Sequence, residues 1–218
     1  MQYSQRLIES TDWVTILLVI CFLLFACTKY FYPKRFNEFT LLPITNKYFS
    51  IHGKNNTISH PFNMLLFAAQ VISVSLFIFL IINTVASNLI NISPTLFFLR
   101  ICTAYTVLVL FKFLIEKIVG NVFSLDTLIN QYLYKKLSYR NFLGGIVFIG
   151  NLLFFYYLPA TPTALFIYGG SILLLNIITL ISCYKNNGNM ILGNFFYFIL
   201  YLCALEISPY IILYKALT

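Results

Sequence analysis

Charged residues are scarce in this chain. Only 9% of its 218 residues are Asp, Glu, Lys or Arg, whereas soluble domains carry about 25%. A packed water-soluble domain is therefore excluded. A disordered chain is excluded as well, because a sequence that is 60% hydrophobic must bury its surface. The mean hydropathy of +0.86 indicates that this surface is buried in a lipid bilayer.

Side chains that catalyse reactions or bind metals are also few. The chain has six acidic residues, two histidines, no H-E-x-x-H motif and no glycine-rich phosphate loop. Its five cysteines show no C-x-x-C spacing. We therefore interpret them as small packing residues. A lipid-modifying enzyme would have to gather its groups at the inner interface from His52, His60, Glu38 and Asp126. We therefore expect no enzyme activity, no catalytic residue, no metal and no cofactor.

Long apolar runs are what the chain has in abundance. A helix needs about 20 mainly apolar residues to cross a hydrocarbon core of about 30 Å. Six runs meet or approach this length, and the fourth is the shortest. The predicted spans are residues 13–32, 62–82, 95–119, 142–158, 164–184 and 190–213. The predicted fold class is all-α, a polytopic membrane protein in which residues 1–218 form one integral membrane domain with six transmembrane helices.

An additional amphipathic helix is predicted at residues 122–138, between the third and fourth spans. Apolar residues that include Leu125 and Ile129 recur there at helical spacing, and Lys135 and Lys136 fall mostly outside that face. We expect this helix to lie in the cytoplasmic interface of the bilayer. A docking face for a partner protein is the alternative.

Positive charge is unevenly divided between alternate loops. Of the 14 Lys and Arg residues, eleven lie on one side, Arg6 and Lys215 lie on the other, and Arg100 falls inside the third span. The positive-inside rule therefore predicts an inner membrane protein with both termini in the periplasm. We interpret the net charge of +8 as a topology signal and expect the basic cytoplasmic segments to contact anionic lipid headgroups. We expect no nucleic-acid partner.

Two ionisable residues inside spans are the candidate functional residues. Glu206 lies about 10 Å inside the outer end of the sixth span, three residues before the helix-kinking Pro209. Arg100 lies about 8 Å inside the same face. The matching depth predicts an ion pair that fixes helix register, with a protonatable coupling site as the alternative. Gln70, Asn151, Asn176 and Asn194 are expected to add hydrogen bonds between helices.

Several short motifs carry a family resemblance. They are residues 12–13 before the first span, 33–36 and 46–49 after it, the terminal Y-L-C-A-L-E-I-S-P at 201–209, and residues 214–215. With these motifs the chain resembles an uncharacterised Bacteroidota inner-membrane family that is defined as a domain of unknown function. The terminal motif Y-L-C-x-L-E-I-x-P is the most specific of them, and it contains both Glu206 and Pro209.

The resemblance implies an integral inner-membrane protein without an assigned activity, from a phylum whose envelope houses type IX secretion and gliding machinery. We therefore expect a structural or accessory subunit of a membrane or envelope complex that binds another membrane protein. The alternative is a small transporter or proton-coupled channel centred on Glu206. A subunit should co-purify with an unlike partner, whereas a transporter should be stable alone and show a solvated cavity that reaches Glu206.

Overall fold

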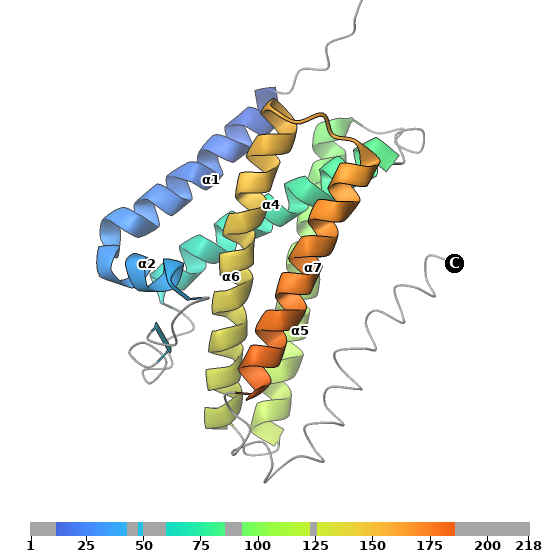
Figure 1. The fold of residues 1–218 in the computed structure, drawn as a ribbon. Helices are drawn as coiled ribbons and strands as arrows, with labels where there is room; N and C mark the ends of the chain where they lie inside the picture. Colours follow the sequence, from blue (N-terminus) through green and yellow to red (C-terminus); the bar gives the residue numbers. More distant parts are fainter. Residues whose placement is uncertain (1–11, 43–47, 50–59, 86–92, 123–125, 186–218) are drawn as a thin grey trace, which may run out of the picture.

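The computed structural model describes residues 12–42, 48–49, 60–85, 93–122 and 126–185. Within these ranges the regular secondary structure is helical, which confirms the predicted all-α class (Figure 1). The helices are α1 (Asp12–Phe31), α2 (Pro33–Thr40), α4 (Pro61–Val85), α5 (Pro94–Val122), α6 (Asp126–Tyr156) and α7 (Pro162–Lys185).

Five of these helices, α1, α4, α5, α6 and α7, are long and apolar enough to cross a membrane. Helices α1, α4, α5 and α7 coincide with the first, second, third and fifth predicted spans, and α6 contains most of the fourth, so the chain is a membrane-embedded helical protein. The sixth predicted span, residues 190–213, lies outside the described residues.

Proline marks where helices begin. Helices α2, α4, α5 and α7 each start at a proline, at Pro33, Pro61, Pro94 and Pro162. Proline fits the first turn of a helix because the N–H that it lacks has no intrahelical partner there, and its φ is already helical. The starts of these four helices can therefore be read from the positions of the prolines in the sequence.

Helix α6 differs from the sequence expectation. Residues 122–138 and 142–158 were expected to form two elements, but the structure has one unbroken helix from Asp126 to Tyr156. No proline interrupts this stretch, and Gly144 and Gly145 lie inside the helix. Its first half also packs inside the protein, because Leu133 and Tyr134 are buried. The apolar spacing of this half therefore serves contacts with other helices.

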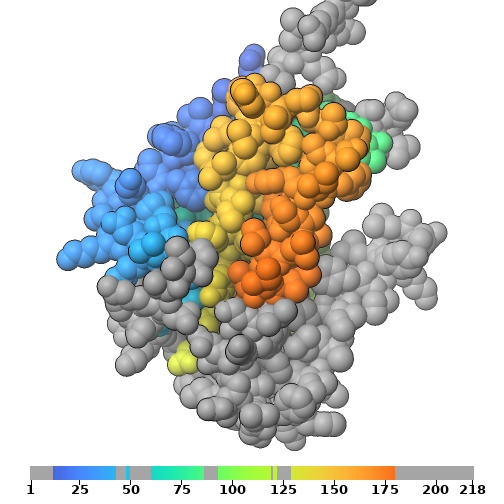
Figure 2. All heavy atoms as spheres, in the orientation of Figure 1, coloured from blue at the N-terminus to red at the C-terminus, as the bar shows by residue number. Residues whose placement is uncertain are grey.

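Helix α4 is the centre of the described bundle. It contacts α1, α5, α6 and α7, and it supplies more buried residues than α1 does. In Figure 1 it crosses the view diagonally behind α6. Helices α5 and α7 are peripheral by comparison, since few of their residues are buried. Figure 2 shows α6 and α7 forming much of one face of the molecule.

Three hydrophobic clusters fill the spaces between helices. The first joins α2 to α4 and α6 through aromatic rings that include Phe39, Phe62 and Tyr134. The second joins α1, α4 and α5 around Leu18 and Leu76. The third, which joins α4, α6 and α7, comprises the buried residues Phe77, Leu80, Val147, Phe154 and Leu165. Polar side chains are placed among these clusters along α4 and α6.

Candidate functional site

A series of buried and half-buried polar side chains lies between α4, α5 and α6, and we call it the polar seam. On α6, Lys136, Arg140 and Gly144 are spaced by four residues and Asn151 follows seven residues later, so these positions share one helix face. The polar seam consists of Gln70 and Ser73 of α4, Tyr105 and Glu116 of α5, and Lys136, Arg140 and Asn151 of α6.

At one end of the seam, an ion pair joins α5 to α6. The Nζ of Lys136 lies 2.6 Å from Oε1 of Glu116. Glu116 is only 2% exposed, so its carboxylate is almost completely removed from solvent. A buried carboxylate is costly unless it is paired, and the nearby ammonium group supplies the compensating charge. The pair therefore fixes the rotation of α6 against α5.

Arg140 lies one helical turn beyond Lys136. Its guanidinium carbon is 5.5 Å from the centre of the Phe67 ring, and it interacts electrostatically with Tyr105 and Glu116. Its Nε is shielded and makes no hydrogen bond, and no carboxylate among the described residues accepts a hydrogen bond from this side chain. Arg140 is therefore a cation in a helix interface without a carboxylate bonded to it.

Near the middle of the seam, α4 and α6 come unusually close. A Cβ placed on Gly144 would lie 2.5 Å from Cγ and 2.9 Å from Cα of Gln70. Only glycine fits such an approach of two helices. Gln70 is fully buried there and donates from Nε2 to the hydroxyl of Tyr105, while its Oε1 makes no hydrogen bond in the described structure. The contact thus links α4, α5 and α6 at one level.

The far end of the seam is closed by an amide. Asn151 donates from Nδ2 to the backbone oxygen of Ser73 at 2.7 Å, and the Ser73 hydroxyl donates to the backbone oxygen of Ala69 at 2.7 Å. The predicted hydrogen bonds between helices are therefore confirmed for Gln70 and Asn151, whereas the Asn176 side chain makes none within the described residues and Asn194 lies outside them. Each such bond contributes about 0.6 to 2 kcal/mol inside a membrane.

A second polar cluster anchors α2 to α6. Arg35 is 8% exposed, donates from Nη2 to the Tyr134 hydroxyl at 3.0 Å, and lies 4.9 Å from the centre of the Phe62 ring. The Tyr134 hydroxyl in turn donates to the Tyr48 hydroxyl at 2.9 Å. Burial acts to lower the pKa of Arg35, and the two tyrosines raise it, so that the net direction is upward. Arg35 therefore remains charged at physiological pH.

The residues of the predicted ion pair are only partly described. Arg100 is exposed on α5, near the end of the helix that begins at Pro94. Glu206 and Pro209 lie outside the described residues. The predicted pair therefore stays a prediction.

The described residues of the predicted amphipathic helix contact other parts of the protein. Ile129 packs against Gly120 of α5, where an added Cβ would lie 3.3 Å from the isoleucine side chain. Lys135 has its ammonium group 5.8 Å from the centre of the Phe49 ring, and Lys136 belongs to the polar seam. Leu125 lies outside the described residues. Sequence reasoning missed the pairing of Lys136 with Glu116, because the two residues are 20 positions apart on different helices.

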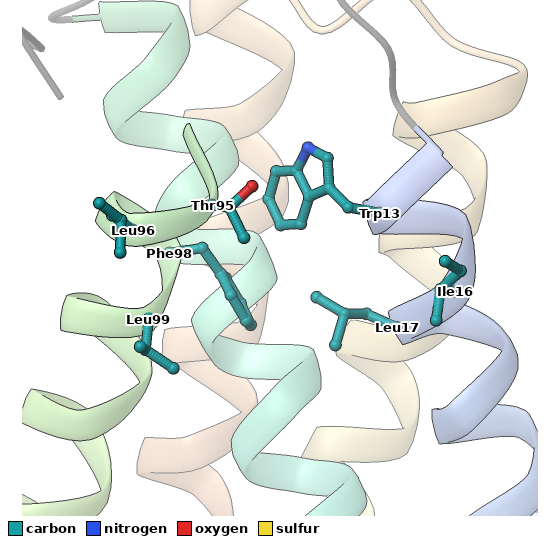
Figure 3. Close-up of a pocket in the computed structure, with 7 residues that line it drawn as sticks. All are labelled: Trp13, Ile16, Leu17, Thr95, Leu96, Phe98 and Leu99. Carbon is teal, nitrogen blue, oxygen red and sulfur yellow. The ribbon is translucent and has the colours of Figure 1, made fainter. Parts of the chain in front are cut away.

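An apolar pocket lies at the other end of the bundle, between the beginnings of α1 and α5 (Figure 3). Its volume is about 300 Å³. The indole of Trp13 and the hydroxyl of Thr95 lie near each other at its rim in this view. The lining residues are Trp13, Ile16, Leu17, Thr95, Leu96, Phe98 and Leu99. This lining suits hydrocarbon and offers no group for acid–base chemistry.

Metal-binding groups do not come together in the described part of the chain, where no three His, Cys, Asp or Glu residues could hold an ion. His60 accepts a hydrogen bond at Nδ1 from the backbone N–H of Phe62, and His52 lies outside the described residues. The chemistry that the described site can perform is thus the binding and positioning of charge.

Comparison with known proteins adds a family. A family model described as a domain of unknown function (DUF4271) matches residues 14–217. No curated protein matches the chain significantly, and no solved structure does so either. The match extends over all the membrane-crossing helices that the structure describes.

Proposed function

The chain belongs to the DUF4271 family, a domain of unknown function, and we propose that it is a non-enzymatic inner-membrane protein that serves as a structural or accessory subunit of a membrane or envelope complex. The interior of the bundle supports this role, because its polar groups link helices to one another. The exposed faces of α5 and α7 leave broad surfaces for a partner within the bilayer.

The observation that carries the proposal is Asn176 on α7. It lies 14 residues after Pro162 and 9 before Lys185, which is about 21 Å and 14 Å along the helix, and therefore near the middle of the span. Its side chain is exposed and makes no hydrogen bond within the described part of the chain. An unpaired amide in hydrocarbon costs several kcal/mol, and we propose that a polar group of the partner protein covers it.

Arg100 on α5 also needs a polar partner within the membrane. This exposed side chain lies about 9 Å along the helix from Pro94. We propose that Arg100 pairs with Glu206 beside Pro209, and that this pair fixes the register of the last apolar run against α5. A structural ion pair of this kind would neutralise the opposite charges that the sequence places at similar depth in two apolar segments.

The proposed setting is the cytoplasmic membrane of a Bacteroidota bacterium. The proposed topology has six spans with both termini in the periplasm and the basic segments facing anionic lipid headgroups in the cytoplasm. The proposed bacterial phylum suggests an envelope assembly, with type IX secretion or gliding machinery as the suggested setting. The partner is another membrane protein, and nucleic acid has no part in the proposal.

A small transporter or proton-coupled channel centred on Glu206 is the second candidate. It is favoured by the buried polar atoms of the described helices that make no hydrogen bond, since such atoms are usually satisfied by water or a transported solute. They include Oε1 of Gln70, both amide atoms of Asn141 and Oδ1 of Asn151. A transporter would be active when purified alone, whereas a subunit would require its partner.

Native gel electrophoresis of the tagged protein tests the subunit proposal. After extraction with a mild detergent, the protein should migrate in one complex with an unlike membrane protein, which mass spectrometry of the excised band identifies. The Asn176→Leu variant should release that partner, because its helix face no longer offers an amide. The Ile177→Leu variant changes an exposed neighbour without removing a polar group and should retain the partner. Migration of the unaltered protein alone would contradict the proposal.

A further inference from the structure

Positive charge is in excess along the helices of the polar seam. Helix α4 has no charged residue, and Glu116 is the one acidic residue in the sequence of α5. Helix α6 has Asp126 at its first position, about 15 Å along the helix from Lys136. Around Glu116 the seam holds Lys136 and Arg140, so one positive charge remains after the carboxylate is paired. An anion would complete the local charge balance.

The position of this charge in the bilayer can be measured along two helices. Counted from Pro94, Glu116 lies about 33 Å along α5, and counted from Tyr156, Lys136 lies about 30 Å along α6. Both distances are close to the thickness of the hydrocarbon core, about 30 Å. The ion pair is therefore level with the edge of the hydrocarbon core, next to the headgroup region that holds the lipid phosphates, and Arg140 is about 6 Å deeper.

We propose that this end of the polar seam binds the phosphate of an anionic phospholipid, with Arg140 as the main ligand and Lys136 as a second contact. A guanidinium binds phosphate through several charge-assisted hydrogen bonds, and basic sites between membrane helices at this level select acidic headgroups. Arg140 lies on the hydrocarbon side of the boundary, where a soluble anion must give up its hydration and gains no apolar contact in return. A lipid brings its phosphate to this level together with chains that are already in the hydrocarbon.

The inference specifies one lipid site within the proposed membrane setting and does not depend on the subunit role. Its test uses the full chain purified in a neutral detergent and stripped of lipid. The melting temperature is measured after addition of dioleoylphosphatidylglycerol, dioleoylphosphatidylcholine or inorganic phosphate. At a concentration 100-fold above the dissociation constant, phosphatidylglycerol should raise the melting temperature by about 5 to 10 °C. The other two additions should have little effect.

Variants assign the lipid effect to the site. Arg140→Gln should abolish the shift, and Arg140→Lys should retain part of it because the charge is kept. The control Lys117→Gln removes the same charge from an exposed position at the same end of α5 and should leave the shift unchanged. Without lipid, Arg140→Gln should be at least as stable as the unaltered protein, because it removes a cation that has no bonded carboxylate.

Two results would overturn the proposed lipid site. Equal shifts with phosphatidylglycerol and phosphatidylcholine would overturn it, as would a shift that inorganic phosphate reproduces. If Arg140→Gln does not fold, native mass spectrometry of the unaltered protein decides, because retained phosphatidylglycerol should exceed retained phosphatidylcholine from an equal mixture. Equal retention would overturn the lipid site while leaving the subunit proposal to its own experiment.

Discussion

Replacement of Gly144 by alanine tests the close contact of α4 and α6 on which the polar seam depends. The new Cβ would lie 2.5 Å from Cγ, 2.6 Å from Cβ and 2.9 Å from Cα of Gln70. The last of these atoms belongs to the backbone, so a change of rotamer cannot relieve the contact. The two helices must therefore move apart, and the hydrogen bond from Gln70 to Tyr105 should weaken with them.

The expected loss of stability follows from three contributions. Overpacking of a close contact costs about 1 to 3 kcal/mol. Loss of the hydrogen bond between Gln70 and Tyr105 adds about 0.6 to 1.7 kcal/mol, and the better helix propensity of alanine recovers about 1 kcal/mol. The free energy of unfolding should thus fall by about 1 to 4 kcal/mol. For a chain of this size, each kcal/mol lowers the melting temperature by about 2 to 4 °C.

The neighbouring glycine provides the control. A Cβ on Gly145 would lie 3.9 Å from Cζ of Phe25, which is an ordinary contact. Gly145→Ala should therefore melt at the temperature of the unaltered protein or slightly above it, as measured with a thiol-reactive or intrinsic fluorescence probe in detergent. If Gly144→Ala and Gly145→Ala melt at the same temperature, α4 and α6 do not approach each other at Gln70, and the geometry of the seam is wrong.

Three further predictions concern charge. Glu116→Gln should lower the free energy of unfolding by about 3 kcal/mol, because Lys136 loses its carboxylate. In thermal denaturation the double variant with Lys136→Met should recover much of that loss, and additive losses would refute the ion pair. Arg100→Leu and Glu206→Leu should each lower the melting temperature, with recovery in the double variant, whereas additive losses would show that these side chains do not meet. In a cysteine-free background, a cysteine at position 54 should not react with an impermeant maleimide in intact cells, whereas cysteines near both termini should react. Labelling at position 54 would show that the topology is the reverse of the predicted one.

Much of the fold follows from the lengths of the apolar runs. Four runs of adequate length predict α1, α4, α5 and α7, because the thickness of the bilayer fixes how many residues a span needs, whereas the shorter fourth run predicts only the second half of α6. Prolines at the starts of four helices reinforce these boundaries. The contact of Ile129 with Gly120 could not be foreseen, because an apolar stripe of helical period packs equally well on lipid or on protein.

The polar seam was predictable only in part. An amide inside an apolar run needs a partner, and Gln70 and Asn151 have one on another helix, but the same rule also selected Asn176, which has none among the described residues. The partner of Lys136 did not stand out, because the pairing depends on the rotation of α6 against α5, which sequence spacing within one helix does not encode. The requirement for glycine at position 144 depends on where two helices cross, which is a property of the assembled bundle.

Site-specific photo-crosslinking in living cells tests the proposed subunit role most directly. A benzophenone amino acid at Leu173, which is 64% exposed and three residues from Asn176 on α7, should crosslink to one unlike membrane protein. The same probe at Val147, which is 3% exposed inside the bundle, should give no such product. Formation of a single heteromeric band at position 173 is the predicted result. Products confined to lipid or to the chain itself at position 173 would contradict the account.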